Sequence, residues 1–514
     1  MRKILDVKKF INKSEFQMKK FFKIFIFLSV CILSSCASTK ITENEVENSV
    51  SAEKKGEQKK FKPLKYNEEK FAIAYNNRDY ETCLRMFLHK TKKKANIRDN
   101  LDLAMLYFIN GEYAKASVVF EKTDEQMFDA LTKSISKSVG KAVLNENLKE
   151  YTGNIYEYLL VNTMNSLCYY LQGDLDNAIN QLTKLSTVKL PEYRRMYGEV
   201  IVNEGLDPSA QEKLDEDIKS LKSYNIDSSV FTANLPQKPT EKDLYKESSF
   251  ARYLSLILRQ ADGDKSQIDS DSIVLKSLVR NFDATDSAIP SGKGRVNVIA
   301  LAGLIGKQTS NEVYFPSKST YFYVPTGNSS YKFLPVQFKF VYPVYKEKNT
   351  VSSVDVVLNS IGTKRSITIE NFNANLEKSV KLRARKEYSA SMSRSIAKKV
   401  SGVVAGIASI NASYEGLKLL KRNSILYTLS SVAFNTLCNT TAVGLSAIDL
   451  TETADIRQGE FFPETVNAAG FTVLAGSYSG KVIYRFSDGS VVEKPFETEV
   501  KEGKPSLVVY SCIK

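Results

Sequence analysis

Apolar residues recur at a helical spacing between about residues 71 and 285, and one arrangement of small and aromatic positions repeats within that stretch. The clearest copy has the spacing A-x2-Y-x3-G-x-Y-x2-A-x3-F and consists of Ala104, Tyr107, Gly111, Tyr113, Ala116 and Phe120. Two further copies consist of Ala74, Arg78, Tyr80, Cys83 and Phe87, and of Ser166, Tyr169, Gly173, Leu175, Ala178 and Leu182. Small residues let two helices approach closely, glycine permits the turn between them, and aromatic residues fill the space against the next pair. The pattern therefore predicts stacked pairs of helices.

The three copies resemble tetratricopeptide repeats, which are helix–turn–helix units that stack on one another. The first copy has no glycine at its turn, and an additional helical segment at 124–144 separates the second copy from the third. A fourth helical unit is expected from the apolar runs at 250–258 and 273–279. The polar stretch 207–242 between the third and fourth units is expected to be a long connection. Together these segments predict a helical repeat domain over residues 65–285.

After the helical region the apolar positions change to the alternation that is typical of strands. Short runs of β-branched and aromatic residues, bounded by Gly, Pro, Asn or Ser, predict strands within 292–365 and again within 465–512. The second set contains an Asp-Gly turn and is expected to form a meander, one sheet of a small β-sandwich. Helical periodicity returns over 372–450. The predicted fold class is α+β, with the helical repeat domain followed by a mixed α/β domain at 286–514 that carries an inserted helical segment.

Within the inserted segment, apolar residues four positions apart form a stripe, and basic residues cover the remainder of the helix. The stripe consists of Val380, Ala384, Tyr388, Met392, Ile396 and Val400. Two interpretations are open: the stripe packs in the core beneath a solvated basic face, or the basic face meets an anionic lipid or cell-wall polymer. A charge-free stretch at 423–448 fits a buried helix better than a membrane span, because it is rich in Ser, Thr and Asn.

The N-terminal residues follow the order of a secretory signal. A basic segment at 18–23 precedes a short apolar segment at 24–33. The run Leu33-Ser34-Ser35-Cys36 then resembles the lipobox of a bacterial lipoprotein signal. The resemblance implies cleavage before Cys36, attachment of lipid to its sulfur and a stable membrane anchor. The alternative is an uncleaved membrane anchor, but the apolar segment is shorter than the roughly 20 residues that a bilayer span needs.

Residues 1–35 are accordingly expected to be a signal peptide, and 1–17 an over-called start, because Met18 alone opens a complete signal. The mostly polar residues 36–64 are expected to be a flexible tether. Many lipoproteins retained at the inner membrane carry an aspartate after the lipidated cysteine, whereas this chain has Ala37. We therefore expect an exported protein that is anchored in the outer membrane and faces the periplasm.

Composition narrows the chemistry. The chain has 72 Lys and Arg against 58 Asp and Glu, a net charge of +14, of which the expected signal peptide holds +6, leaving +8. The single histidine, His89, excludes most metal sites and every Ser-His-Asp arrangement that does not use it. The later cysteines are scattered singly, which favours buried thiols and leaves disulfides open as the alternative: Cys83, Cys168, Cys438 and Cys512. We expect no cofactor, no metal and no nucleic-acid partner, and no small-molecule substrate is identified.

The order of a lipobox, degenerate tetratricopeptide units and a mixed C-terminal region resembles a family of uncharacterised bacterial lipoproteins. The resemblance is carried by Tyr151, Gly153, Tyr156, Glu157, Tyr169-Tyr170-Leu171, Gly173-Asp174, Phe250-Ala251, Tyr253-Leu254, the strand after Gly294, Thr453-Ala454-Asp455, Arg457 and Phe462-Pro463. It implies an exported, tethered protein with no known catalytic activity. In the motif Ala454-Asp455-x-Arg457, the charged residues are either a catalytic or ligand-clamping pair or a structural ion pair.

These observations lead us to expect a non-enzymatic protein-binding scaffold or assembly factor, anchored by lipid, whose repeats bind another envelope protein. One alternative is a cell-wall hydrolase that works through paired carboxylates. Its candidate residues are Glu370, Glu377, Asp455 and Glu460, and no spacing among them selects a pair. The other alternative is an accessory subunit of an outer-membrane secretion machine, which differs from the scaffold mainly in its partner.

Overall fold

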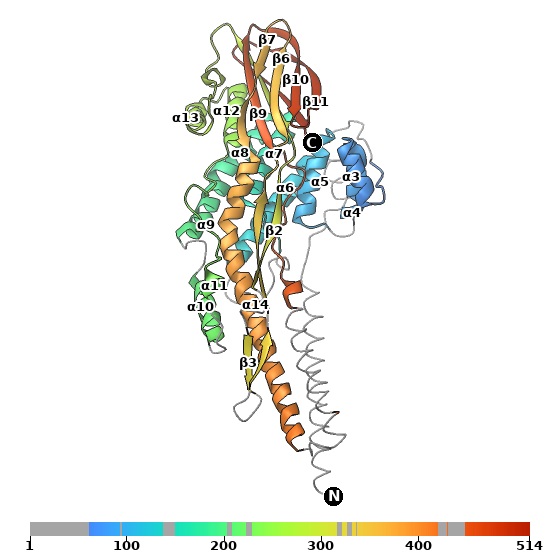
Figure 1. The fold of residues 1–514 in the computed structure, drawn as a ribbon. Coiled ribbons are helices and arrows are strands. Elements are labelled where there is room, and N and C mark those ends of the chain that lie inside the picture. Colours follow the sequence, from blue (N-terminus) through green and yellow to red (C-terminus); the bar gives the residue numbers. More distant parts are fainter. Residues whose placement is uncertain are drawn as a thin grey trace. The chain divides into compact units, whose positions relative to one another are not determined.

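A computed structural model of the protein describes residues 61–92, 95–136, 150–202, 208–222, 229–315, 321–325, 331–335, 337–419, 429 and 448–514. The chain is a mixed α+β protein, in which an N-terminal helical region is followed by a strand-rich part with one long inserted helix (Figure 1). The lipobox, Cys36 and nearly all of the expected tether lie outside the described residues. Among the described residues, no helix is both long enough and apolar enough to cross a membrane.

Most helices of the N-terminal region occur as consecutive pairs. Their bounds are α3 Glu68–Asn76, α4 Tyr80–Thr91, α5 Ile97–Ile109, α6 Tyr113–Ser136, α7 Ile155–Leu171, α8 Leu175–Lys184, α9 Leu190–Val202, α10 Pro208–Lys222, α11 Ser229–Thr232, α12 Ser249–Asp262 and α13 Ile268–Leu278. A single π-helical turn, Leu185–Lys189, joins α8 to α9. The expectation that 207–242 is a connection is wrong in part. Helix α10 begins at Pro208, which is favourable at the first helical position, and Leu214 is buried in its mostly polar sequence.

Four helix pairs share one turn geometry. In each pair, α3–α4, α5–α6, α7–α8 and α12–α13, a residue one or two positions after the first helix has a left-handed backbone, with φ of 60° at Arg78, 78° at Gly111, 82° at Gly173 and 92° at Gly263. The next backbone N–H then donates to the carbonyl five residues earlier, which is the Schellman arrangement. These bonds join Asp79 to Ala74 (2.9 Å), Glu112 to Tyr107 (3.0 Å), Asp174 to Tyr169 (2.9 Å) and Asp264 to Arg259 (3.0 Å). The first copy keeps the turn without glycine, because Arg78 adopts the left-handed conformation.

Within the described residues, the strand-rich part contains two four-stranded sheets and two two-stranded ribbons. Its strands are β1 Gly294–Ala302, β2 Lys307–Phe315, β3 Tyr321–Pro325, β4 Tyr331–Pro335, β5 Phe338–Lys346, β6 Val351–Leu358, β7 Gly362–Arg365, β8 Ile367–Asn371, β9 Thr465–Val473, β10 Gly476–Phe486, β11 Val491–Val500 and β12 Pro505–Cys512. The first sheet has the order β12-β1-β9-β8, the second β11-β10-β6-β7, and the ribbons pair β2 with β5 and β3 with β4. The predicted C-terminal meander is wrong in part: β10 and β11 form the expected hairpin in the second sheet, whereas β9 and β12 belong to the first sheet. Strand β12 pairs with β1 in parallel.

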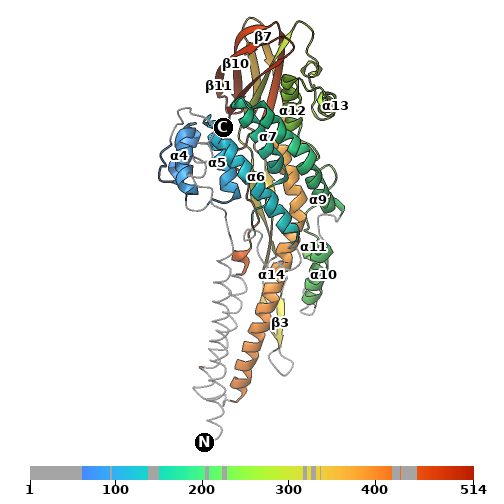
Figure 2. The same cartoon turned by 180° about the vertical axis from the view of Figure 1, so that it is seen from behind.

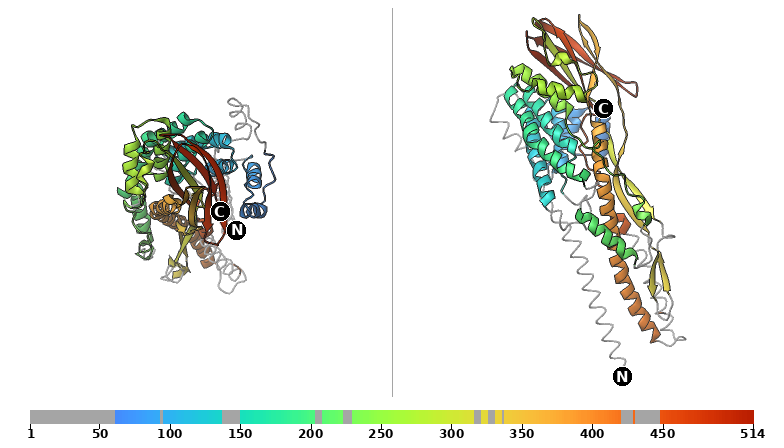
Figure 3. Two further views of the ribbon diagram at one scale, coloured as in Figure 1. Left: turned by 90° about the horizontal axis from the view of Figure 1, so that it is seen from above. Right: turned by 90° about the vertical axis from the view of Figure 1, so that its left-hand side faces the viewer.

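Strand β1 is buried along its whole length because it lies between two layers. Val296, Val298 and Ala300 belong to the core shared with the second sheet, in which Val356, Val482 and Phe496 are members. Ile299 and Leu301 belong instead to the core shared with the helices. The alternation of a strand thus places the first sheet between the helices and the second sheet. Figures 2 and 3 show the helices and the strands from other sides.

The inserted helix α14, Phe372–Lys418, packs against β5, α7 and α10. Its predicted apolar stripe is buried at Val380, Ala384, Tyr388, Met392 and Ile396, whereas Val400 at its end is only partly buried. Several basic residues of the helix pair with acidic residues of the same chain. Arg394 and Lys398 contact Glu452 at 3.1 and 2.8 Å, and Lys399 contacts Asp449 at 2.7 Å. These ion pairs favour core packing over a lipid-facing role for this part of the basic face.

Candidate functional site

The residues of the repeat pattern build the helical core. Ala104, Ala116, Phe120 and Ala178 are fully buried, and Tyr107 is 2% exposed. Tyr113 and Tyr169 are partly buried against the same core. Gly111 and Gly173 form turns, as predicted. These residues therefore hold the helices in position. The candidate site has to be sought among the groups that the helices direct toward other parts of the chain.

One stretch of the chain itself, residues 455–463, contacts several of these helices, and we call it the resident segment. It lies between the 3-10 turn Ile448–Thr451 and β9, and it forms neither helix nor strand. The ring of Phe461 is surrounded by three aromatic rings of the first helix pair. Its centroid is 5.9 Å from that of Phe71, 5.7 Å from Tyr75 and 6.0 Å from Phe87. Phe461 is 4% exposed as a result.

Two buried carboxylates accept backbone amides of the resident segment. Glu157 of α7 accepts the N–H of Gly459 at 2.6 Å. Asp102 of α5 accepts the N–H of Glu460 at 2.6 Å and that of Phe461 at 3.3 Å. Both carboxylates are at most 2% exposed. The helices thus bind the main chain of the segment through buried carboxyl oxygens.

Burial shapes the electrostatics of both carboxylates. Desolvation raises the pKa of Asp102 well above its usual range, and the nearby charge of Glu460 raises it further. Desolvation also raises the pKa of Glu157, although the N–H groups of Gly459 and Asn154 and the hydroxyl of Tyr151 lower it in part. Ionised carboxylates at these two positions therefore cost folding energy that the hydrogen bonds only partly offset.

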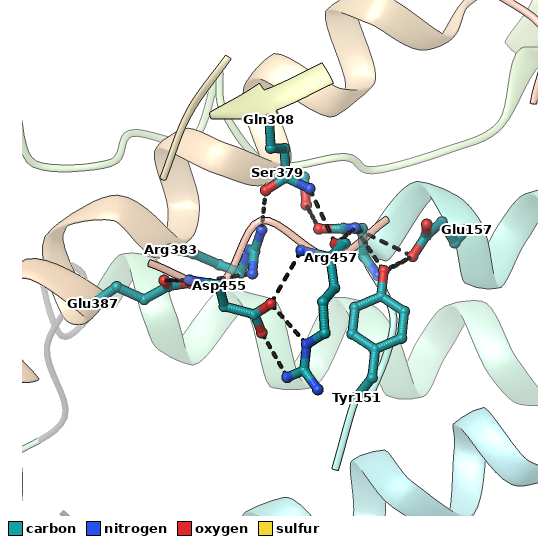
Figure 4. Close-up of polar contacts among 9 residues, drawn as sticks. Tyr151, Glu157, Gln308, Ser379, Arg383, Glu387, Asp455 and Arg457 are labelled. Atoms are coloured by element: carbon teal, nitrogen blue, oxygen red, sulfur yellow. Dashed lines mark hydrogen bonds and ion pairs between the residues drawn. The ribbon is translucent and has the colours of Figure 1, made fainter. Parts of the chain in front are cut away.

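The start of α7 is the point at which the resident segment meets the helices and the strands (Figure 4). Glu157 accepts from the hydroxyl of Tyr151 at 2.5 Å and from the backbone N–H of Asn154 at 2.6 Å, as in a capping box. The side-chain amide of Asn154 donates to the carbonyl of Arg457 at 3.3 Å, and that of Gln308 on β2 donates to the same carbonyl at 3.3 Å. The junction therefore joins α7, β2 and the resident segment.

Asp455 and Arg457 form a bidentate ion pair inside this junction. The guanidinium Nε and Nη2 atoms each lie 2.8 Å from a carboxylate oxygen of Asp455. The guanidinium also lies 5.1 Å from the ring centroid of Tyr151, a cation–π distance. Burial alone would raise the pKa of Asp455, but the hydrogen bonds and charge of Arg457, with the charge of Arg383, lower it below its usual value. Ala454 is buried beside the pair. The geometry fits the structural interpretation of this motif better than the catalytic one.

The carboxylates considered for hydrolysis are each held by a different set of partners. Glu370 is buried and accepts from Ser248 at 2.8 Å and from the N–H of Phe250 at 2.9 Å. Glu377 is exposed on α14 and pairs with Lys381 at 2.8 Å. Asp455 is paired with Arg457, as described above, and Glu460 is exposed on the resident segment. These contacts do not assemble an acid and a base around one cavity.

A small cavity lies between α8, α9 and α12, with a volume of about 20 Å³. Its lining includes Leu182, Leu185, Ser248, Arg252, Ser255 and Arg259. A cavity of this size holds about one water molecule, so it offers no room for a substrate. Within the described residues no group of three His, Cys, Asp or Glu side chains is placed to hold a metal ion. Cys83, Cys168 and Cys512 are buried free thiols there, and Cys438 lies outside the described ranges.

Sequence reasoning did not identify Asp102 or Phe461 as contact residues. One signal was present, because Asp102 is a charged residue in the strongly apolar helix α5, where an acidic side chain needs a specific partner. Glu157 and Phe462 were noted only for the family resemblance. No protein-family model, no curated protein and no solved structure matches this chain.

Proposed function

We propose that the protein is an exported, lipid-anchored envelope protein that acts as a non-enzymatic protein-binding scaffold or assembly factor. The observation that carries the proposal is the set of four helix pairs with one common turn geometry. Stacked helix pairs offer extended surfaces for protein partners, and this is their commonest use. We interpret the pairs as tetratricopeptide-like units and the two facing four-stranded sheets as a β-sandwich. Membership in the lipoprotein family that the sequence resembles is part of the same proposal.

The anchor rests on the lipobox sequence. Lipid on Cys36 would attach a long polar tether ahead of the first described helix, so the folded part could reach a partner beyond the headgroups. The second alternative, an accessory subunit of a secretion machine, is a scaffold with a particular partner and needs no separate argument. The hydrolase gains no support from the geometry of its candidate carboxylates.

Two measurements test the proposal. The intact mass of the mature protein from envelopes should match a chain that begins at a lipidated Cys36, and Cys36→Ser should release the protein from the membrane fraction. Cross-linking in intact cells, followed by purification under denaturing conditions, should recover one stoichiometric protein partner. The same cross-linking with a variant of Ile273, an exposed apolar residue of α13, serves as the control for non-specific capture. This variant should recover the same partner as the wild type. An unlipidated mature terminus would refute the anchor, and a purified monomer that degrades cell wall would refute the scaffold.

A further inference from the structure

The contacts of the resident segment are of the kind that helical repeats use for extended peptides. The acceptors and the aromatic rings come from three separate helix pairs: Phe71, Tyr75 and Phe87 from the first, Asp102 from the second and Glu157 from the third. We call these five residues the segment-binding face. The segment contributes no helix or strand to this contact, and its main-chain N–H groups are what the carboxylates bind.

We propose that the segment-binding face is a peptide-binding site whose resident ligand is the chain's own segment 455–463. The site takes a peptide in a non-strand conformation, with a glycine followed, two and three positions later, by aromatic residues. An outside peptide of this kind then competes with the segment for the same face. This inference goes beyond the proposed function, because it concerns what already occupies the helices and stands whether or not the protein has an envelope partner.

The register of the ligand follows from the amide contacts. Successive N–H groups of Gly459, Glu460 and Phe461 all donate to the face, the first to Glu157 and the next two to Asp102. Three consecutive amides aimed at one side do not fit a strand, since a strand alternates its amides between two sides, and the segment forms no helix either. The carboxylates therefore recognise the main chain in one local conformation, whichever side chain stands at Glu460.

The side-chain requirements follow from packing. A Cβ atom at Gly459 would lie 2.4 Å from the ring of Phe462, so this position accepts glycine alone while that ring is in place. Phe461 fills the space among the three aromatic rings of α3 and α4, and Phe462 is fully buried. The other side of the segment is held by the β1–β2 connection, where the N–H of Ile305 donates to the carbonyl of Phe462 at 3.0 Å. A competing peptide has to replace that contact as well.

The test uses the full-length protein and a fluorescent peptide with the sequence of residues 455–464. In the wild type the resident segment occupies the face, so only the small fraction of molecules in which the segment has detached can bind the peptide. The apparent affinity for the peptide is lowered in proportion to that fraction. Phe461→Ala weakens the resident segment and should tighten peptide binding by about tenfold or more. Phe496→Ala is the matched control, because Phe496 is equally buried but lies in the core between the two sheets. It should leave peptide binding at the wild-type level.

Two altered peptides sharpen the result. Methylation of the backbone nitrogen at the position of Phe461 removes one donor to Asp102, and alanine at the position of Gly459 clashes with the following ring. Each change should abolish binding to Phe461→Ala. Should that variant fail to fold, Phe461→Leu keeps most of the buried volume and serves in its place. The proposal is overturned if the folded variant binds the peptide no better than wild type and Phe496→Ala, or if the altered peptides bind equally well.

Discussion

Strand β1 presents different chemistry to its two neighbours. Toward the second sheet it buries Val296 and Val298 in a core whose members are almost all apolar. Toward the helices it buries Arg295 and Asn297, which bond to Asp286 at 2.5 and 2.6 Å. The carboxylate–amide contacts of the resident segment also lie on the helical side. A core of the first kind gains stability from packed volume and is insensitive to pH, whereas one of the second kind depends on complete pairing and responds to pH.

The largest loss is expected from the apolar core. Phe496→Ala removes a buried aromatic side chain and should lower the free energy of unfolding by about 3–5 kcal/mol. The loss should be the same at pH 5 and pH 8, because no ionisable group changes its surroundings. Denaturant unfolding at both pH values measures it, with Val491→Ala, which is 49% exposed, as the control that should change stability by less than about 0.5 kcal/mol. A loss that varies strongly with pH would contradict the comparison.

A slightly smaller loss is expected from the polar face of the same strand. Arg295→Met leaves the buried carboxylate of Asp286 without its cation and should cost about 3 kcal/mol at pH 8. Burial already raises the pKa of Asp286, and removing Arg295 raises it further. As the pH falls, a carboxyl whose pKa is raised in the folded state is protonated in the folded protein before it is protonated in the unfolded chain. The loss of stability caused by Arg295→Met should therefore shrink as the pH falls toward 5. The double variant Arg295→Met/Asp286→Asn should recover stability at pH 8; if it does not, the pairing account of this face is wrong.

The contact between α5 and the resident segment should give a loss of intermediate size. Asp102→Ala leaves two buried N–H groups without an acceptor and should cost about 2 kcal/mol. Asp102→Asn keeps an oxygen acceptor and removes the charge. Because the pKa of Asp102 is raised in the native state, wild-type stability falls as the pH rises through that pKa. The free energy of unfolding of Asp102→Asn should therefore rise relative to that of the wild type between pH 5 and pH 8. A difference between the two proteins that stays the same at both pH values would contradict this expectation.

The smallest effect is expected at the ion pair of the junction. Arg457→Gln removes a partly exposed pair and should cost about 1 kcal/mol at pH 7. Arg457 helps to lower the pKa of Asp455, so its stabilisation is present above the ordinary Asp pKa and disappears as the pH falls toward 3. Arg485→Gln is the matched control, since Arg485 is 47% exposed in its pair with Asp355 and should change little. Equal losses at pH 7 and pH 3 would contradict the assignment.

Local patterns predicted what is local in the structure. The spacing around Gly111 and Gly173 gave the helix pairs and their turns, because the turn depends on a few neighbouring residues. The buried stripe on α14 was predictable in the same way, because it depends only on the spacing of apolar residues within one helix. Helix α10 was missed because its sequence is mostly polar and its burial depends on α14, to which it is adjacent only in the fold.

The contacts of the candidate site could not be derived in this way. Asp102 and the amide of Glu460 are 358 residues apart in the chain, and no periodicity connects them. The division of the C-terminal strands between two sheets was also hidden, because β12 leaves its hairpin neighbour to pair in parallel with β1. Apolar and polar residues alternate along each strand as expected. This alternation does not determine which strand will be its neighbour in the sheet. Tertiary pairing decides both.

Hydrogen exchange of the resident segment tests most directly whether the helices hold it as a ligand. Phe87→Ala removes one of the aromatic rings around Phe461 from the helical side, and Val482→Ala removes two fully buried methyl groups from the core between the sheets. In full-length protein, Phe87→Ala should speed amide exchange across 455–463 while leaving β10 and β11 protected, and Val482→Ala should do the reverse. Equal exchange of 455–463 in the two variants would contradict the account, because the segment would then be held by the fold as a whole and not by the segment-binding face.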